Sequence, residues 1–261
     1  MNEEFETGSH QHRFSGIQRL YGKEAPAKLK KAHVLIVGIG GVGSWAAESL
    51  ARTGLGHITL LDWDDICFSN TNRQIHAMNG TAGRAKVDVM AERINLINPD
   101  CRVDAVRDFY TKENADEILS KPYDYVIDAI DSLSAKCHLI SECKKRGLPL
   151  FVSGSAGGRS DPSLITVCDL ARAVNDPLLS RVRKKLRQNY NFSRYVKKKF
   201  HIECVYTSEF PMAPETCELE GEADVARSLD CQTGYGTATF ITGIFGFRAG
   251  ERAIAHILKK N

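Results

Sequence analysis

A short apolar run that leads directly into a glycine-rich turn constrains the fold of this 261-residue chain more than any other feature. Residues 34–37 read Val-Leu-Ile-Val, as expected of a strand buried on both faces of a sheet. The turn Gly38-Ile39-Gly40-Gly41-Val42-Gly43 follows, and a helical pattern covers residues 44–53. This order of strand, glycine turn and helix predicts a nucleotide-binding α/β unit, in which the helix N-terminus faces phosphate.

The rest of the chain alternates between apolar runs and helical patterns. Further strands are predicted over residues 58–61, 103–106, 125–127 and 150–152, and further helices over residues 84–98 and 132–146. The alternation predicts a Rossmann-like α/β fold with a doubly wound, mostly parallel sheet and an elaborated C-terminal half. Because no Pro/Ser-rich linker interrupts it, we expect one domain over residues 1–261, with an N-terminal arm over residues 1–25.

The C-terminal stretch is unusually poor in charge. Residues 231–247 contain no charged side chain, but these 17 residues are rich in Gly and Thr. A membrane-spanning helix needs about 20 mostly apolar residues. We therefore expect a buried C-terminal helix over residues 231–261, in which Gly243 and Gly246 let another backbone approach, with a dimer interface as one use and weak membrane association as the minor alternative.

Cysteine usage points to a reducing compartment. The chain has eight cysteines, none of them in a C-x-x-C pair, and residues 1–11 contain no apolar run of a secretory signal. Reduced thiols in a cytoplasmic protein are the expected state, and a structural zinc ion is not expected.

Polar residues that follow the predicted strands indicate the ligand. Asp62 lies 19 residues after Gly43, where a carboxylate that binds ribose is expected. Arg73 and Lys86 add positive charge beyond what the diphosphate of a nicotinamide cofactor uses, which favours ATP over NAD. Asp131 follows a central strand and is placed to hold Mg²⁺ on the phosphates.

Together these motifs resemble the adenylation domain of the ubiquitin-activating-enzyme superfamily, which includes the ThiF-like activators of bacterial sulfur carriers. The matching motifs are Gly38-x-Gly40-Gly41-x-Gly43, Asp62-x-Asp64, Asn70-x-Asn72-Arg73, Lys86 and Asp128-x-x-Asp131. The resemblance implies that Asp62, Asp64, Asn70, Arg73, Lys86 and Asp131 handle ATP and magnesium while a substrate carboxylate attacks the α-phosphate. It also implies a homodimer. Relatives place an arginine where Gly16 stands, so Arg13 or Arg19 would reach the partner's site instead.

A second set of motifs resembles one branch of this superfamily, the bacterial tRNA threonylcarbamoyladenosine dehydratases. These motifs lie over residues 13–22, 43–48 and 70–77 and at Asp230-Cys231 before Gly234-x-Gly236. The resemblance implies ATP-dependent cyclisation of a threonylcarbamoyl group on a tRNA adenosine, through an acyl-adenylate. It also associates the chain with a cysteine desulfurase partner, and it leaves open a monovalent cation (Na⁺ or K⁺) in the loop over residues 153–158.

A basic segment supports a tRNA partner independently of the resemblance. Residues 177–200 lack any acidic residue, and Tyr190, Phe192 and Tyr195 are interleaved among the cations. Such a segment, predicted over residues 175–200, suits a phosphate backbone, with the aromatic rings stacking on bases of a single-stranded RNA loop rather than binding DNA. The predicted tRNA contacts are Arg181, Arg183, Lys184, Lys185, Arg187, Arg194, Lys197, Lys198 and Lys199.

The catalytic assignment comprises Arg73, Lys86, Asp131 and Cys231, the last as a thiol that could capture the adenylate carbonyl. His76 is a candidate proton carrier, although such a residue more often packs or caps, and the other cysteines are expected to be small core residues. Three alternatives stay open: an adenylyltransferase for a sulfur-carrier protein, an NAD-dependent dehydrogenase, and a sulfur-relay scaffold.

Overall fold

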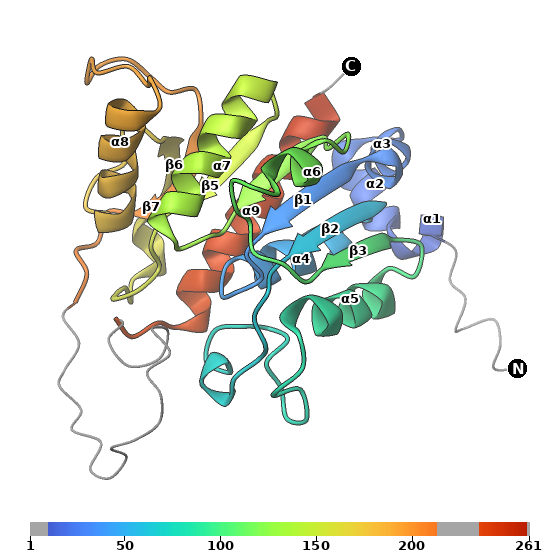
Figure 1. Ribbon diagram of the computed structural model, residues 1–261. Helices are drawn as coiled ribbons and strands as arrows, with labels where there is room; N and C mark the ends of the chain where they lie inside the picture. Colours follow the sequence, from blue (N-terminus) through green and yellow to red (C-terminus); the bar gives the residue numbers. More distant parts are fainter. Residues whose placement is uncertain (1–9, 213–234, 260–261) are drawn as a thin grey trace, which may run out of the picture.

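The computed structural model describes residues 10–212 and 235–259, and these form a single seven-stranded sheet with helices on both faces (Figure 1). The strands are β1 (His33–Val37), β2 (His57–Leu61), β3 (Arg102–Val106), β4 (Tyr125–Asp128), β5 (Leu150–Ser153), β6 (Ile165–Asp169) and β7 (Glu203–Thr207). Their order is β3-β2-β1-β4-β5-β7-β6, and every neighbouring pair is parallel except β6 with β7. The predicted doubly wound, mostly parallel sheet is confirmed.

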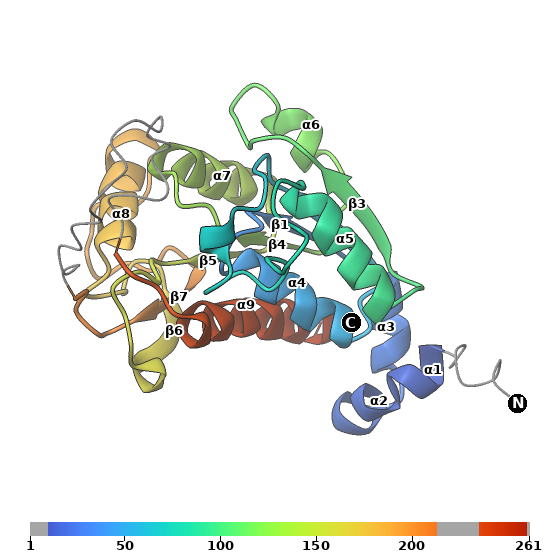
Figure 2. The same ribbon diagram turned by 90° about the horizontal axis from the view of Figure 1, so that it is seen from below.

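The helices divide between the two faces of this sheet (Figure 2). Their bounds are α1 (His10–Arg13), α2 (Ser15–Tyr21), α3 (Ala25–Lys31), α4 (Gly43–Arg52), α5 (Lys86–Ile97), α6 (Ala115–Leu119), α7 (Leu133–Arg146), α8 (Pro177–Asn189) and α9 (Thr239–Lys259). One core packs α4, α5 and α9 on the sheet, and the other packs α6, α7 and α8 on the opposite face. Strand β1 is buried at every position, which explains its uninterrupted apolar sequence.

The turn between β1 and α4 depends on two of its glycines. Gly38 has a φ of 91°, and a Cβ on it would lie 2.8 Å from the carbonyl oxygen of Ala129. A Cβ on Gly43 would lie only 1.8 Å from the carbonyl oxygen of Gly38. A side chain at Gly43 would therefore push α4 away from the turn, and one at Gly38 would overlap the backbone that follows β4.

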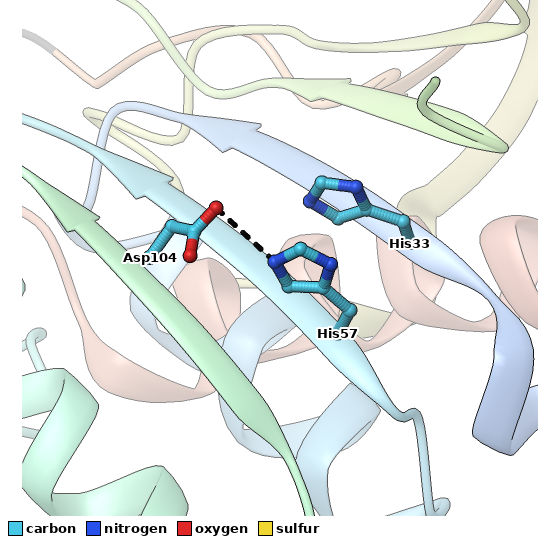
Figure 3. A group of neighbouring side chains, drawn as sticks. All are labelled: His33, His57 and Asp104. Carbon is cyan, nitrogen blue, oxygen red and sulfur yellow. Dashed lines mark ion pairs between the residues drawn. The ribbon is translucent and has the colours of Figure 1, made fainter. Parts of the chain in front are cut away.

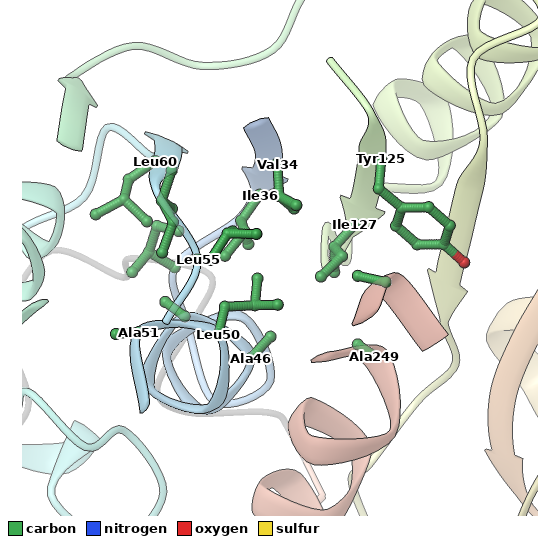
Figure 4. Close-up of a cluster of buried hydrophobic side chains, with 14 of the residues drawn as sticks. Val34, Ile36, Ala46, Leu50, Ala51, Leu55, Leu60, Tyr125, Ile127 and Ala249 are labelled. Atoms are coloured by element: carbon green, nitrogen blue, oxygen red, sulfur yellow. The ribbon is translucent and has the colours of Figure 1, made fainter. Parts of the chain in front are cut away.

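Helix α9 lies against α4, and both helices contribute to the core drawn in Figure 4. A Cβ on Gly246 would lie 2.6 Å from the carbonyl oxygen of Val42, which confirms the expected close approach of another backbone. The helix begins at Thr239, later than the predicted residue 231, and the described residues before it, 235–238, are not helical. Among the helices of the described ranges, none is both long and apolar enough to span a bilayer.

The described part of the predicted N-terminal arm is helical and packed. Residues 10–21 form α1 and α2, and Phe14 is 3% exposed. A Cβ on Gly54, just after α4, would lie 3.0 Å from the Phe14 ring. This contact fixes the segment to the end of α4.

Gly246→Ala is expected to lower the free energy of unfolding by about 1–3 kcal/mol, because the added methyl group overlaps backbone atoms of α4 that cannot move independently. Chemical denaturation measures the change. Gly243→Ala is the matched control. Its Cβ would meet Trp45 at an ordinary 3.8 Å, so the higher helix propensity of alanine should leave stability unchanged or raised. Equal losses in both variants would contradict the close approach of α9 to α4.

Candidate nucleotide-binding site

A pocket of about 910 Å³ opens at the carboxyl ends of β1 and β4, between which the strand order reverses. This is where open α/β sheets bind ligands. Most of the predicted site residues line it together: Gly38, Gly40, Gly41, Asp62, Asp64, Asn70, Arg73, Lys86 and Asp131. Gly43 stands behind the turn, at the first position of α4, where it provides close packing rather than a pocket wall.

Asp62 holds the glycine turn in place. One carboxylate oxygen accepts a hydrogen bond from the Ile39 N–H at 2.6 Å, and the other accepts from the Asp64 N–H at 2.9 Å. Burial raises the pKa of the Asp62 carboxyl above its ordinary value, and the nearby Lys86 charge opposes this rise. The carboxylate therefore shapes the turn, and it also lies at the pocket wall.

Lys86 enters the pocket from the first residue of α5. Its ammonium group lies 2.7 Å from a carboxylate oxygen of Asp64, and its side chain is only 9% exposed. Withdrawal from water strengthens the interaction of such a charge with a phosphate group. The two partners are 22 residues apart, so only the fold brings them together.

Arg73 and Asn70 lie on the crossover after β2, which includes the 3-10 helix η1 (Phe68–Asn70). The guanidinium of Arg73 donates to the Ser69 carbonyl at 2.8 Å and to the Asn72 side chain at 2.9 Å. The Asn70 side chain accepts from the Cys67 N–H at 3.0 Å and so stabilises the turn. These bonds pre-orient Arg73 at the pocket wall.

His76 is poorly suited to carry protons. Its side chain is fully buried, and neither ring nitrogen has a hydrogen-bond partner among the described residues. Burial, together with the charges of Lys86 and Arg93, lowers its pKa to about 3. The ring is therefore neutral at neutral pH and packs in the core.

A fully buried ion pair that sequence reasoning missed supports the loop of Asp131. The Asp128 carboxylate accepts from the Lys136 ammonium at 2.8 Å and from the Ile130 N–H at 3.0 Å. Both side chains are 0% exposed. Lys136 lies inside an amphipathic helix, where a lysine ordinarily faces water, so nothing in the local sequence signals its burial.

Asp176 joins helix α8 to the pocket and was also missed. It is 2% exposed, caps α8 by accepting from the Leu179 N–H at 2.8 Å, and accepts from the Ser155 N–H at 2.8 Å. Ser155 lies in the loop after β5, and that loop and Leu178 both line the pocket. The Asp-Pro pair at the start of α8 is a helix-start signal that could have identified the cap.

All nine predicted tRNA-binding cations lie on or after α8, whose apolar face packs on the core. Arg183 and Arg187 share a pocket of about 370 Å³ with Lys184 and Arg194. One guanidinium nitrogen of Arg183 and one of Arg187 are buried without a hydrogen-bond partner in the described chain. Burial and the neighbouring Arg187 lower the pKa of Arg183. Two guanidinium groups that line one pocket, each with a nitrogen that lacks a partner, favour an anion.

The aromatic part of the basic segment is only partly available. Tyr195 is 81% exposed, but Phe192 is 5% exposed and packs edge-to-face on Phe200. The prediction that Phe192 stacks on RNA bases was therefore wrong. The chain after α8 packs against the same core as the helix, and burial of the Phe192 ring stabilises this packing.

Arg13 lies outside the pocket of its own chain. It is the last residue of α1, and its guanidinium donates to the Ile97 carbonyl at the end of α5, at 3.4 Å. Cys231 lies outside the described residues.

A second group of polar side chains lies at the opposite end of the strands (Figure 3). The rings of His33 and His57 stack at 3.4 Å, and the His57 Nε2 atom lies 3.2 Å from the Asp104 carboxylate. Burial lowers the pKa of His33 to about 4 and lowers that of His57. Lys121 and Arg102 already neutralise Asp104, and lone pairs in two nearly parallel ring planes do not converge on one ion. The group is better suited to packing than to holding a metal.

Asp176→Ala is expected to lower the free energy of unfolding by about 2 kcal/mol, because it removes a helix cap and leaves the Ser155 N–H without its acceptor. Hydrogen exchange should accelerate at the amides of Ser155 and Leu179 together. Asp161→Ala, which removes the cap of the 3-10 helix η2 (Pro162–Leu164), is the control and should leave both amides protected. Exchange that accelerates at only one of the two amides would contradict the conclusion that Asp176 links α8 to the loop after β5.

Comparisons with known proteins agree with this geometry. A relative from Haemophilus influenzae, named tRNA threonylcarbamoyladenosine dehydratase, is 46% identical over 255 residues, which is 97% of this chain and 95% of the relative. Two solved structures of the E. coli enzyme of that name, TcdA, one in complex with ATP and one with AMP, superpose with TM-scores of 0.86 and 0.87. Both are 44% identical, and each match covers 96% of this chain and 95% of the other. The ThiF family model matches residues 14–260, and the chain belongs to the ThiF family.

Proposed function

We propose that this protein catalyses the ATP-dependent dehydration of threonylcarbamoyladenosine in tRNA, a ring closure that proceeds through an acyl-adenylate. The observation that carries the proposal is the pair of hydrogen bonds at Asp176, which connects the pocket to a helix whose cations are partly unsatisfied. In this proposal an ATP site and an RNA-binding surface share one structural element. The names of the full-length relatives, and the ATP and AMP complexes of one of them, support the same reaction.

In the first step the threonyl carboxylate attacks the α-phosphate of ATP and pyrophosphate leaves. A carboxylate has no leaving group at neutral pH, so this step converts one of its oxygens into part of AMP. Lys86 and Arg73 lie where they would stabilise the negative charge that develops on the phosphates. The N–H groups of the turn at Gly40 and Gly41, and the N-terminus of α4, would bind phosphate oxygens.

In the second step a nitrogen or oxygen of the ureido group attacks the activated carbonyl, AMP leaves and the ring closes with loss of a proton. The carboxylate oxygen departs on AMP, which accounts for the net loss of water. Asp131, an exposed carboxylate at the pocket wall, would hold Mg²⁺, which supplies charge neutralisation on the phosphates. Asp62 and Asp64 would contact the ribose side of the nucleotide.

The loop after β5 contains its own cation. Arg159 is 3% exposed and donates to the carbonyl oxygens of Gly157 and Asn175 at 2.6 and 3.0 Å. Arg159 therefore brings a fixed positive charge to this loop, next to any Na⁺ or K⁺ that residues 153–158 would bind.

A homodimer in the cytoplasm is part of the proposal. Phe240 and Phe247 of α9 are about half exposed, at 53% and 46%, and such apolar side chains suit a subunit interface. Arg13 lies away from its own pocket, so its role would be exercised at the partner's nucleotide. Cys231 is not needed for an intramolecular ring closure, and a cysteine desulfurase partner would bind without entering this chemistry.

Lys86→Met should reduce ATP–pyrophosphate exchange by about 100-fold, because the phosphates lose a partly desolvated charge. The exchange is measured with tRNA that carries threonylcarbamoyladenosine. Lys31→Met, an exposed change on α3, is the control and should leave exchange unchanged. Exchange that requires a sulfur-carrier peptide instead of tRNA would favour the adenylyltransferase, and tight NADH binding without exchange would favour a dehydrogenase.

The double variant Arg183→Gln/Arg187→Gln should weaken tRNA binding by about 10-fold or more and reduce its salt dependence, while ATP binding stays intact. Glutamine keeps part of each side-chain stem, so packing on α8 changes little. Lys23→Gln/Lys31→Gln removes the same charge at exposed positions and should bind tRNA almost as well as the unaltered protein. Equal losses in the two double variants would show that α8 acts only through net charge.

A further inference from the structure

Two cysteines lie directly opposite each other at the edge of the sheet. Cys168 of β6 pairs with Cys204 of β7 in the antiparallel register. The Leu170 N–H donates to the Ile202 carbonyl, and the Ser208 N–H donates to the Leu164 carbonyl. Because hydrogen-bonded pairs alternate along such a ladder, Cys168 and Cys204 form a hydrogen-bonded pair, with Cα atoms about 5.5 Å apart. Disulfides most often span about 5.5–6 Å between Cα atoms.

The surroundings of the two thiols differ, and the difference suits a reaction in which one thiol is oxidised first and the second then attacks it. Cys204 is fully buried, whereas Cys168 is partly exposed. The Cys168 thiol donates to the Asp169 carbonyl at 3.2 Å. The neighbouring Cys204 thiol lowers the pKa of the Cys168 thiol, and Tyr206 and the charge of Arg183 act in the same direction. Burial instead raises the pKa of Cys101 and Cys143 to about 12.

We propose that Cys168 and Cys204 are a redox-active dithiol that closes to an intramolecular disulfide on exposure to a peroxide or a small-molecule disulfide. The Cys168 thiol loses its proton, its thiolate attacks an oxygen of hydrogen peroxide, and the O–O bond breaks. A sulfenic acid and hydroxide form, and the released proton converts the hydroxide to water. The Cys204 thiol then attacks that sulfur and displaces the second water. In sum, two thiols and one peroxide give one disulfide and two waters. A small-molecule disulfide oxidises the pair by exchange and is released as two thiols.

The bond is compatible with the fold as it stands. Side chains of directly opposed residues in an antiparallel pair point to the same face of the sheet. Both cysteines contact the core beneath α7 and α8, so oxidation would link β6 to β7 without separating either strand from the sheet. The dithiol does not depend on the proposed adenylation chemistry.

The test uses the full chain carrying Cys67→Ser, Cys217→Ser and Cys231→Ser, which removes the exposed thiol and the two cysteines outside the described residues. The protein is titrated with hydrogen peroxide or glutathione disulfide, alkylated, digested without reductant and analysed by mass spectrometry. The expected product is a peptide pair linked through residues 168 and 204, formed at least about 10-fold faster than Cys101 is oxidised and reversed by dithiothreitol.

Adding Cys168→Ser or Cys204→Ser should each abolish the linked peptide, and circular dichroism verifies that these variants are folded. With Cys204→Ser, Cys168 should stop at the sulfenic acid or at the mixed disulfide with glutathione. Oxidation of Cys168 without linkage to Cys204 in the parent protein would overturn the proposal. So would loss of Cys168 and Cys101 at equal rates.

Discussion

The close approach of α4 to the end of β1 is the constraint on which the rest of this structure depends. Gly43 packs against the Gly38 carbonyl at a distance that no side chain would allow, and Asp62 holds Ile39 from the neighbouring strand. Together these contacts direct the N-terminus of α4 at the pocket. Helix α9 then packs on α4 through Gly246, so the C-terminal helix supports the same turn from behind.

The cations of this half of the molecule differ in how they are paired. Lys86 is held by Asp64 at the pocket wall, and Lys136 is neutralised by Asp128 in the interior. Arg183 and Arg187, on α8, are partly buried, and each keeps one buried guanidinium nitrogen without a partner among the described residues. A buried charge without a partner is costly, so these two cations favour an anion that would pair with them. Asp176 places these surface cations at a fixed position relative to the pocket.

Sequence reasoning succeeded where short-range rules apply. The apolar runs, the glycine turn and the helical spacing predict the strands and helices of the nucleotide-binding half to within a few residues. It failed where the outcome depends on distant partners. Phe192 was predicted to face RNA but is buried against Phe200, and Lys136 and Asp176 were missed because their partners lie on other elements. Asp62 was expected to bind ribose, and the sequence did not reveal that both of its oxygens hold the backbone of the turn.

The sequence by itself determined the alternation of strands and helices, the backbone freedom of the turn and the acid-free basic segment, because these follow from side-chain pattern and local conformation. The tertiary structure alone decided which side chains are paired and which charged groups lack a partner. Lys86 and Asp64, or Cys168 and Cys204, come together only through crossovers and strand pairing. The physical reason is that burial and pairing depend on groups that are distant in the sequence and come close only on folding, so no local sequence pattern identifies them.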